Sequence, residues 1–455
     1  MKLVAETDLS EIIKDIRALI GGRDHGILIN ILVDLHPADV ARILNELKKD
    51  ERKYLFNLLP TEMASSVITE LDPPIVEQIL ADISHTKIST LVDRMDSDDA
   101  ADLISDLPDE VANRVLDQVP TEVSEEVKEL LLYEEDTAGG IMALEYVAIR
   151  QNMTVKQTIK EIRKAKDDID TILTVWVVDD HNILAGSVSL TDLVLAKGKE
   201  TIANLMNTDI KSVPTNMDQE EITILFRKYD LVVLAVVNPK GQLVGQITID
   251  DVIDIVDEEV SEDLAIFAGA NDEELQEESF MKVSWFRLPW LMVAFLGQLI
   301  AALVVQRFET TLAELIALTF FMPVIMAMGG NGGIQSSIIV IRGLATGEIS
   351  LKSIWRRFFR ELRVSLFIGF VFGALMTLVV GIWLGNYLMG LIIGVALNIV
   401  ILQATLIGGL IPFILKRVNI DPALASGPFI TTFNDILGLL IYLAIITEAM
   451  PFYIK

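Results

Sequence analysis

Five long apolar stretches in the C-terminal part of the chain constrain its fold more than any other feature. They cover Leu288–Gln306, Leu312–Ile341, Val364–Leu384, Leu388–Leu415 and Ala423–Ile446. Each reaches the roughly 20 residues that an α-helix needs to cross about 30 Å of hydrocarbon. The sequence therefore predicts a five-helix α transmembrane domain over residues 285–455, in a multi-pass protein of the cell (plasma) membrane.

The charges that flank these stretches predict their orientation. The first 20 residues are charged and amphipathic and have no apolar signal-peptide core, so we expect a cytoplasmic N-terminus. The loop between the second and third stretches then lies inside, and it holds Arg342, Lys352, Arg356, Arg357, Arg360 and Arg363. The outer side has only Arg307 and Lys455, in agreement with the positive-inside rule. An odd number of spans places the C-terminus outside.

The part of the chain before the membrane is strongly acidic. Of 65 Asp and Glu and 37 Lys and Arg, only 7 and 11 lie from Arg287 onward, which leaves a net charge of −32 on the first 286 residues. Nucleic acids and anionic lipid surfaces require basic patches, so neither is an expected partner of this part. The chain has no Cys and four scattered His, which disfavours zinc and copper sites. Any bound metal should be an oxygen-preferring ion such as Mg²⁺ or Ca²⁺.

The first part of the chain repeats a short helical unit. Turn and cap signals fall at intervals of about a dozen residues, at Pro37, Asp50, Pro60, Pro73, Ser84, Ser97, Pro108 and Pro120. Proline at a helix start followed by acids is typical of a helix N-terminus. Short helices at a fixed period stack into a solenoid, so we expect a superhelical α-helical N domain over residues 1–132. A generic helical bundle is the alternative.

A second repeat alternates strands and helices. The sequence from Val178 to Ala196 aligns with that from Val237 to Ile255, and the alignment pairs Gly186 with Gly245 and Asp192 with Asp251. These copies resemble a tandem pair of CBS domains, with residues 133–200 and 201–256 as the two copies. CBS pairs are regulatory, often dimerise and often bind adenine nucleotides. The resemblance implies an α/β sensing module and leaves open whether this one binds ATP.

Between Gly241 and Met281 the chain carries 13 Asp or Glu and no Lys or Arg. Such a segment repels itself and closes only when cations or a basic partner neutralise it. We therefore expect either a cation-responsive switch or a solvated spacer at the entrance to the membrane domain.

The apolar stretches contain two candidate ion-binding features. Asp435 is the only carboxylate deep inside a predicted span, and an intramembrane acid is a candidate functional residue by default. Gly427, Thr431 and Gly438 share its helical face, and Asn434 lies beside it. The sequence Met328–Gln335 contains four glycines around Asn331 and is expected to interrupt the second span. A purely structural aspartate and close helix packing are the respective alternatives.

This combination resembles the MgtE family of magnesium channels and transporters. The resemblance rests on Gly329-Gly330-Asn331-x-Gly333-x-Gln335, on Asp421-Pro422-Ala423 and on Thr431-Thr432-x-x-Asp435-x-x-Gly438. It implies a homodimer that conducts Mg²⁺ through a pore between subunits and closes when intracellular Mg²⁺ is high. It also implies an acidic connecting (plug) helix, with its linker, over residues 257–284.

The resemblance assigns roles to individual residues. In the pore it implies Asp435, Asn331 through bound water, and the backbone at Gly427. The sensor acids that it implies are Asp251, Asp254, Glu259, Glu262 and Asp263 near the plug helix, Asp218, Glu220 and Asp230 in the second CBS copy, and Glu62, Asp98, Asp99 and Asp102 in the N domain.

Other functions have less support. A divalent-cation exchanger coupled to Na⁺ or H⁺ remains an alternative, because Asp435 could also carry a proton. An anion transporter would need cationic groups deep in the spans, and the sequence has none there. A membrane-anchored sensor would not need a mid-membrane aspartate. We find no nucleophile and base set, phosphate-cradling loop or zinc motif, so enzymatic activity is not expected.

Overall fold

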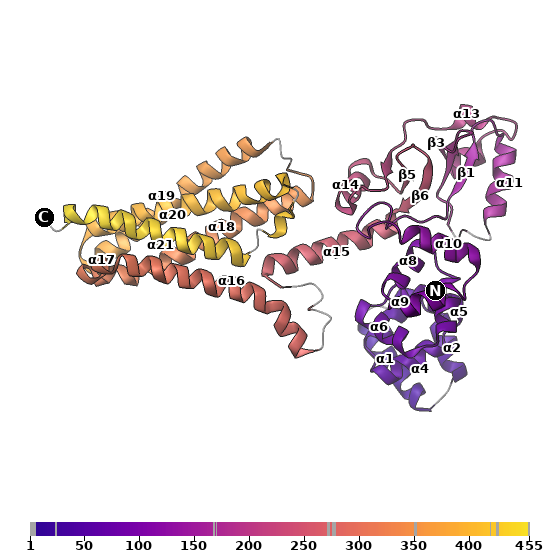
Figure 1. Cartoon of the computed structure of the whole chain (residues 1–455), viewed down its shortest axis with the longest axis horizontal. Coiled ribbons are helices and arrows are strands. Elements are labelled where there is room, and N and C mark those ends of the chain that lie inside the picture. Colours follow the sequence, from indigo (N-terminus) through magenta and orange to yellow (C-terminus); the bar gives the residue numbers. More distant parts are fainter. Residues whose placement is uncertain are drawn as a thin grey trace. The chain divides into compact units, whose positions relative to one another are not determined.

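The computed structural model describes residues 6–22, 25–166, 169, 171–270, 274, 279–349, 353–418, 420–424 and 427–453 (Figure 1). The chain forms two compact units, which we call the N-terminal unit, Met1–Val256, and the C-terminal unit, Asp257–Lys455. Part of the predicted acidic segment lies outside the described residues, namely Asp272, Glu273, Glu277 and Glu278.

The N-terminal unit begins with a stack of short helices. Within the described residues these are α1 (Glu6–Gly22), α2 (His25–Val33), α3 (Pro37–Asn45), α4 (Lys49–Leu58), α5 (Thr61–Ile68), α6 (Pro73–Asp82), α7 (His85–Val92), α8 (Ser97–Ser105), α9 (Asp109–Leu116) and α10 (Thr121–Leu130). From α3 onward each helix begins within one residue of a predicted turn or cap signal. Helices two apart in sequence pack together, with α3, α5, α7 and α9 in one row and with α4 on α6 and α8 on α10. The helical N domain is confirmed, and this alternate packing is that of a solenoid.

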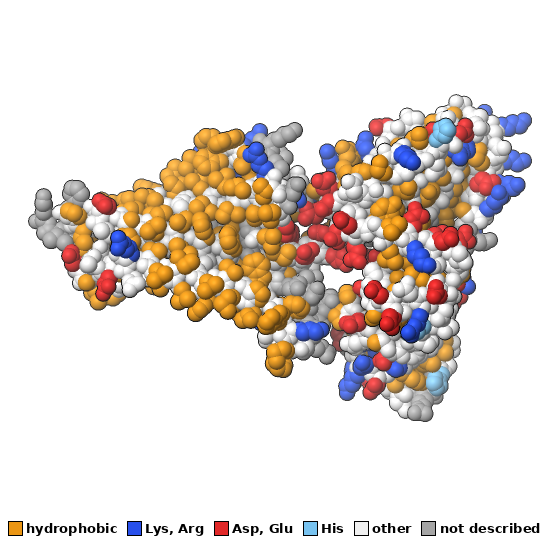
Figure 2. Space-filling view, viewed as in Figure 1, with side chains coloured by type: hydrophobic (Ala, Val, Ile, Leu, Met, Phe, Trp, Pro, Cys, Tyr) orange, Lys and Arg blue, Asp and Glu red, His pale blue; other side chains and the backbone are white. Residues whose placement is uncertain are grey.

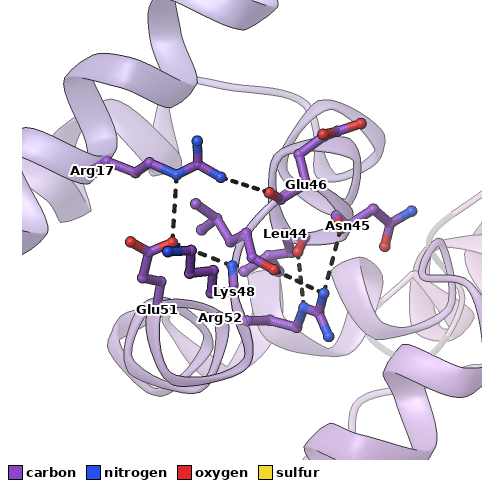
Figure 3. Close-up of polar contacts among 8 residues, drawn as sticks. Arg17, Leu44, Asn45, Glu46, Lys48, Glu51 and Arg52 are labelled. Carbon is purple, nitrogen blue, oxygen red and sulfur yellow. Dashed lines mark hydrogen bonds and ion pairs between the residues drawn. The ribbon is translucent and has the colours of Figure 1, made fainter. Parts of the chain in front are cut away.

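Two arginines, the buried Arg52 and the exposed Arg17, link α4 and α1 to the end of α3 (Figure 3). The Arg52 guanidinium donates to the carbonyl oxygens of Leu44 and Leu47, each at 2.9 Å, and so satisfies groups left unpaired at the end of α3. Arg17 on α1 donates to the carbonyl of Glu46 at 2.9 Å. These bonds fix successive helices at positions where hydrophobic packing alone leaves backbone groups without partners.

The CBS pair follows as two copies of one topology. Its elements are β1 (Val147–Arg150), α11 (Val155–Ala165), β2 (Thr174–Val178), β3 (Leu184–Ser189), α12 (Leu190–Leu195), α13 (Ile202–Leu205), β4 (Ser212–Pro214), α14 (Gln219–Tyr229), β5 (Val233–Val237) and β6 (Leu243–Thr248). Each copy has a three-stranded sheet, with one parallel and one antiparallel pairing. Gly186 pairs with Val177, and Gly245 pairs with Val236 at the equivalent position. The predicted duplication is confirmed.

A long acidic helix, α15 (Ile249–Ala268), follows the second CBS copy. It begins with a cap in which the Thr248 hydroxyl donates to Asp251 Oδ2 at 2.5 Å. Figure 2 shows Asp and Glu side chains gathered over this helix. The predicted connecting helix is therefore present, although it begins well before residue 257.

The C-terminal unit contains α16 (Phe280–Arg307), α17 (Glu309–Glu314), η2 (Ile316–Phe320), α18 (Met322–Ala345), α19 (Ile354–Leu384), α20 (Tyr387–Arg417), η4 (Pro422–Leu424) and α21 (Gly427–Tyr453). Among the described residues, five helical segments are long and apolar enough to cross a membrane, which confirms the predicted number. Helix α20 packs against α18, α19 and α21, and α16 packs against α21.

The second span corrects one prediction. Helix α18 runs without interruption through Gly329, Gly330, Gly332 and Gly333, so the expected break at these glycines is wrong. The irregular part of this span lies near its start, where the 3₁₀ helix η2 follows α17 and precedes α18. The glycines serve close packing, because a Cβ added at Gly333 would meet the side chain of Asn434 and lie 3.3 Å from the carbonyl oxygen of Ala404. Because glycine has no side chain, neighbouring helices approach α18 closely while its backbone hydrogen bonds stay intact.

Candidate functional sites

Asp435 lies eight residues after the start of α21 and is buried, with 6% of its surface exposed. Its Oδ2 accepts a hydrogen bond of 2.8 Å from Gln298 Nε2 on α16. The buried acids among the described residues of the C-terminal unit are Asp435 and Glu361. Glu361 forms an ion pair of 2.6 Å with Arg357, whereas no basic partner of Asp435 is found in that part of the chain. Asp435 is therefore the buried acid whose charge remains available to a cation.

A glycine surface on α18 faces this aspartate. A Cβ added at Gly330 would lie 3.2 Å from Thr431 Cγ2 and 3.9 Å from Asp435 Oδ1. Any larger residue would fill the space next to the carboxylate. The structure thus brings the glycines of α18 next to the predicted aspartate. It does so by packing an intact helix against α21, without the predicted break.

Buried amides extend the polar region beside Asp435. Asn434 is fully buried, and its Oδ1 accepts a hydrogen bond of 3.0 Å from Gln403 Nε2 on α20. Within the described chain, Asn434 Nδ2 and Gln403 Oε1 have no hydrogen-bond partner. Leaving such groups unpaired costs about 1–3 kcal/mol each, so this region suits water or a hydrated ion. Our sequence reasoning missed Gln298 and Gln403, although a glutamine within an apolar span is a visible signal.

The other two predicted pore residues occupy different surroundings. The Asn331 side chain is exposed on α18, as is that of Gln335 on the same face. Gly427 is the first residue of α21, and its carbonyl oxygen accepts a hydrogen bond of 2.6 Å from Thr431 Oγ1. A Cβ added at Gly427 would lie 3.1 Å from the carbonyl oxygen of Phe267, so the end of α15 approaches the start of α21 closely. Within one chain, Asn331 faces outward and Gly427 contacts the acidic helix.

The N-terminal unit contains a separate acidic cluster between α8 and the start of α15. Burial, followed by the negative charges of Asp251 and Asp99, raises the pKa of Asp98 well above its ordinary value. Burial, followed by the charges of Asp96 and Asp251, raises the pKa of Asp99 to about 7. Burial also raises the pKa of Asp251. Asp102 and Asp254 add further repulsion at Asp99. These predicted sensor acids meet across two elements that lie about 150 residues apart in sequence.

Glu145, which our sequence reasoning missed, places α8 against the first CBS copy. Its carboxylate accepts hydrogen bonds from the backbone N–H of Ser97 at 3.1 Å and from the Ser97 hydroxyl at 2.8 Å. The same hydroxyl accepts a bond from the backbone N–H of Leu144 at 2.8 Å. A carboxylate at a helix N-terminus is stabilised by the helix dipole. Glu145 therefore holds the cluster in place while adding a negative charge near Asp98.

The remaining predicted sensor acids are distributed more widely. Asp218 accepts from the backbone N–H of Glu220 at 2.9 Å and caps α14, while Asp230 ends α14 in a left-handed conformation. Glu62 is exposed in the first turn of α5, Glu262 is exposed on α15, and Glu259 and Asp263 are half-buried there. Among the described residues, no three acids or histidines lie close enough to hold one metal ion directly.

Comparison with known proteins agrees with these features. The family profile described as MgtE, a divalent cation transporter, matches residues 322–445. The MgtE intracellular N domain matches 35–136, and CBS domains match 138–199 and 202–258.

The chain is 38% identical over 423 residues to the magnesium transporter MgtE of Thermus thermophilus, covering 91% of this chain and 93% of that protein. It is 39% identical to the magnesium transporter MgtE of Bacillus subtilis over 71% of this chain and 72% of that protein.

Solved structures resemble the N-terminal half. The cytosolic domain of the Mg²⁺ channel MgtE in complex with ATP is 34% identical, covers 53% of this chain and 99% of that chain, and gives a TM-score of 0.52. The soluble part of a magnesium transporter is 28% identical, covers 55% of this chain and 99% of that chain, and gives a TM-score of 0.51. Fold, sites and similarity together define a membrane transporter with a CBS regulatory module. The chain belongs to the MgtE family of divalent cation transporters.

Proposed function

We propose that this protein admits Mg²⁺ into the cell through a pore that intracellular Mg²⁺ closes. The observation that carries the proposal is Asp435, a buried carboxylate in α21 with an amide donor and no basic partner among the described residues. A cation that enters its surroundings is stabilised by a charge that the protein itself does not neutralise. The family relatives are named as magnesium transporters, which supports Mg²⁺ as the substrate.

The pore is formed by a homodimer in this proposal. Two-fold symmetry would place two copies of Asp435 about one axis, so a divalent ion meets two negative charges. Mg²⁺ releases its water reluctantly, so a few carboxylates that contact the hydration shell suffice. Asn331 is exposed in the single chain and would then accept hydrogen bonds from that water, together with the backbone carbonyl at Gly427. The unpaired amides at Asn434 and Gln403 support a hydrated path.

The acidic cluster supports the proposal that intracellular Mg²⁺ closes the pore. Burial, followed by the negative charges of neighbouring acids, raises the pKa of Asp98 and Asp99, so these carboxylates repel one another once they are charged where α8 meets α15. Hydrated Mg²⁺ between them would relieve this repulsion and favour the closed arrangement. We assign Asp102, Asp251, Asp254 and Glu62 to the same response, together with Glu259, Glu262 and Asp263 on α15. Asp218, Glu220 and Asp230 belong to it in the second CBS copy. In this proposal the N-terminus is cytoplasmic and the C-terminus is outside. The predicted domain limits are kept, except that the connecting helix begins at Ile249.

ATP binding by the CBS pair is part of the proposal. A cavity of about 380 Å³ between the two copies is lined by Trp176, Asp209, Lys211 and Tyr229. Lys211 Nζ lies over the Tyr229 ring, 5.3 Å from its centroid, and forms an ion pair of 3.3 Å with Asp209. In this proposal an aromatic ring of the lining stacks on adenine, the Asp209 carboxylate accepts from ribose hydroxyls, and Lys211 contacts phosphate. The ATP-bound structure of a related cytosolic domain supports this assignment.

Flux in liposomes tests the main proposal. We expect Asp435→Asn to reduce Mg²⁺ uptake by up to about 1,000-fold, because a unit charge pair 4 Å apart at an effective dielectric constant of 20 is worth about 4 kcal/mol. Glu314→Gln removes an exposed acid of the same unit and serves as the matched control. Gel filtration confirms that each variant folds. Unchanged uptake by a well-folded Asp435→Asn variant would refute the proposal.

A further inference from the structure

A basic cavity lies where α18 ends and α19 begins. It has a volume of about 500 Å³, and its charged lining consists of Arg342, Arg356, Arg357, Arg360 and Glu348. All of these residues belong to the C-terminal unit, and neither the ion pathway nor the acidic cluster uses them. The positive-inside rule accounts for arginines at this end of the spans but not for their gathering around one cavity. Four guanidinium groups there repel one another, and an anion between them would lower their energy.

One of these arginines is fixed in place by the protein. Arg357 is 9% exposed and forms an ion pair of 2.6 Å with Glu361, which also accepts a hydrogen bond of 2.9 Å from Ser336 Oγ. The Nε–H of Arg357 is buried and has no hydrogen-bond partner in the described chain. A buried N–H donor of a charged group without an acceptor is costly, so a ligand oxygen is expected there.

The remaining charges of the cavity are not neutralised by the protein. For Arg342, Arg356 and Arg360 no ion pair is found with any residue that the structure describes, and their side chains are exposed. Glu348 is the acid in the lining. With Glu361 counted against Arg357, the cavity keeps an excess of positive charge. Arginine forks bind phosphate oxygens through paired hydrogen bonds, which makes phosphate the fitting ligand.

The surroundings of the cavity indicate where that phosphate comes from. Ile338 and Ile339 line it and are 43% and 53% exposed, while Trp355 and Phe359 beside it are 70% and 54% exposed. Figure 2 shows Lys and Arg side chains at the edge of the broad hydrophobic surface of the C-terminal unit. Exposed aromatic and aliphatic side chains at the end of a span belong at the boundary between headgroups and acyl chains.

We propose that this cavity binds the headgroup phosphate of an anionic phospholipid, whose acyl chains lie along the exposed side chains of α18 and α19. Arg357 supplies a fixed donor, and Arg356 and Arg360 complete the contact from the same helix. Basic pockets between membrane helices favour anionic headgroups, at about a fivefold gain in affinity for each basic residue near the surface. Zwitterionic lipids gain less because their own cation opposes the arginines.

Binding to the full-length protein in detergent tests this proposal. The probes are dioctanoyl phosphatidylglycerol, dioctanoyl phosphatidylcholine and inorganic phosphate, each followed by the dissociation constant and by the shift in thermal unfolding. The double variant Arg356→Gln/Arg360→Gln should weaken phosphatidylglycerol binding about 25-fold. Arg363→Gln is the matched control, since Arg363 is exposed on the same helix and does not line the cavity. Glu348→Gln should strengthen binding because it removes the opposing charge.

The outcomes separate the possible sources of phosphate. Selective binding of phosphatidylglycerol that the double variant loses and the control keeps supports the lipid site. Equal binding by wild type and double variant overturns it, as does equal affinity for the two lipids. Inorganic phosphate that binds as tightly as phosphatidylglycerol would identify a soluble anion and overturn the lipid assignment. Because the altered arginines are exposed, gel filtration of the double variant is expected to match wild type.

Discussion

Replacing Asp99 with asparagine is expected to stabilise the N-terminal unit in the absence of Mg²⁺. The pKa of Asp99 is raised from 3.8 to about 7, first by burial and then by Asp96 and Asp251. The folded unit therefore holds a proton on Asp99 that the unfolded chain releases near pH 4. A folded-state pKa above the unfolded value contributes stability at low pH that is lost as the pH rises. Between about pH 4 and pH 7, the loss from this group is about 1.4 kcal/mol per pH unit.

The expected change in the free energy of unfolding follows from the size of the pKa shift at Asp99. A displacement of roughly three units corresponds to about 4 kcal/mol of unfavourable free energy once the carboxylate is charged. Asparagine has nearly the same shape and no charge, so Asp99→Asn should raise the free energy of unfolding at pH 8 by up to about 4 kcal/mol. At pH 5 the gain should be smaller, about 1–2 kcal/mol, because wild-type Asp99 is then protonated.

Urea unfolding of the N-terminal unit at pH 5 to 8, with a chelator present, measures this effect. The equivalent part of a related protein has been crystallised alone, which supports its use as a separate domain. Asp109→Asn is the matched control, because Asp109 also lies in the first turn of a helix and is exposed. Both substitutions lose a helix-dipole contribution of about 0.3–1 kcal/mol, so the difference between their effects on the free energy of unfolding measures the contribution of the acidic cluster.

Addition of Mg²⁺ completes the test. Millimolar Mg²⁺ should stabilise wild type strongly at pH 8 and stabilise Asp99→Asn less, because the variant lacks one of the charges that the ion neutralises. The wild-type response should weaken below pH 7, where protons compete for Asp99. If wild type and Asp99→Asn show the same pH dependence and the same response to Mg²⁺, the repulsion that we infer at α8 does not exist.

Two further substitutions separate packing and capping from ion binding. Gly333→Ala should destabilise the C-terminal unit in thermal unfolding by about 1–3 kcal/mol, because the added Cβ meets the Asn434 amide. Gly332→Ala should destabilise it less, because its Cβ would lie 3.3 Å from Thr405 Oγ1. Equal effects would contradict the packing argument. Asp218→Ala should cost about 1 kcal/mol through the lost cap, whereas Asp218→Asn keeps the cap. A reduced Mg²⁺ response in Asp218→Asn would assign the carboxylate to the sensor, and an unchanged response would limit it to capping.

Local patterns were sufficient to predict the elements of this fold. Proline and cap signals predicted the starts of the N-domain helices, because the residues of a first turn act on their own backbone. The duplicated sequence predicted both CBS sheets, including the equivalent positions of Gly186 and Gly245. Hydropathy over about 20 residues predicted the five spans, since the thickness of the membrane fixes their length.

The same local reasoning failed at the glycines of α18. Four glycines within five residues indicate a break when only propensity is considered. In the structure their missing side chains make room for Asn434 and Thr431, so packing preserves the helix. Propensity describes a helix in isolation, whereas the neighbouring helices decide whether the backbone stays helical.

The sequence by itself determined the number of spans, the order of the domains and the identity of the isolated intramembrane acid, because each depends on residues close together along the chain. Only the tertiary structure decided that Gln298 bonds Asp435, that Glu145 caps α8, and that Asp98 and Asp99 meet Asp251. These contacts join residues far apart in sequence. Their energies depend on distance and burial, which exist only once the chain has folded.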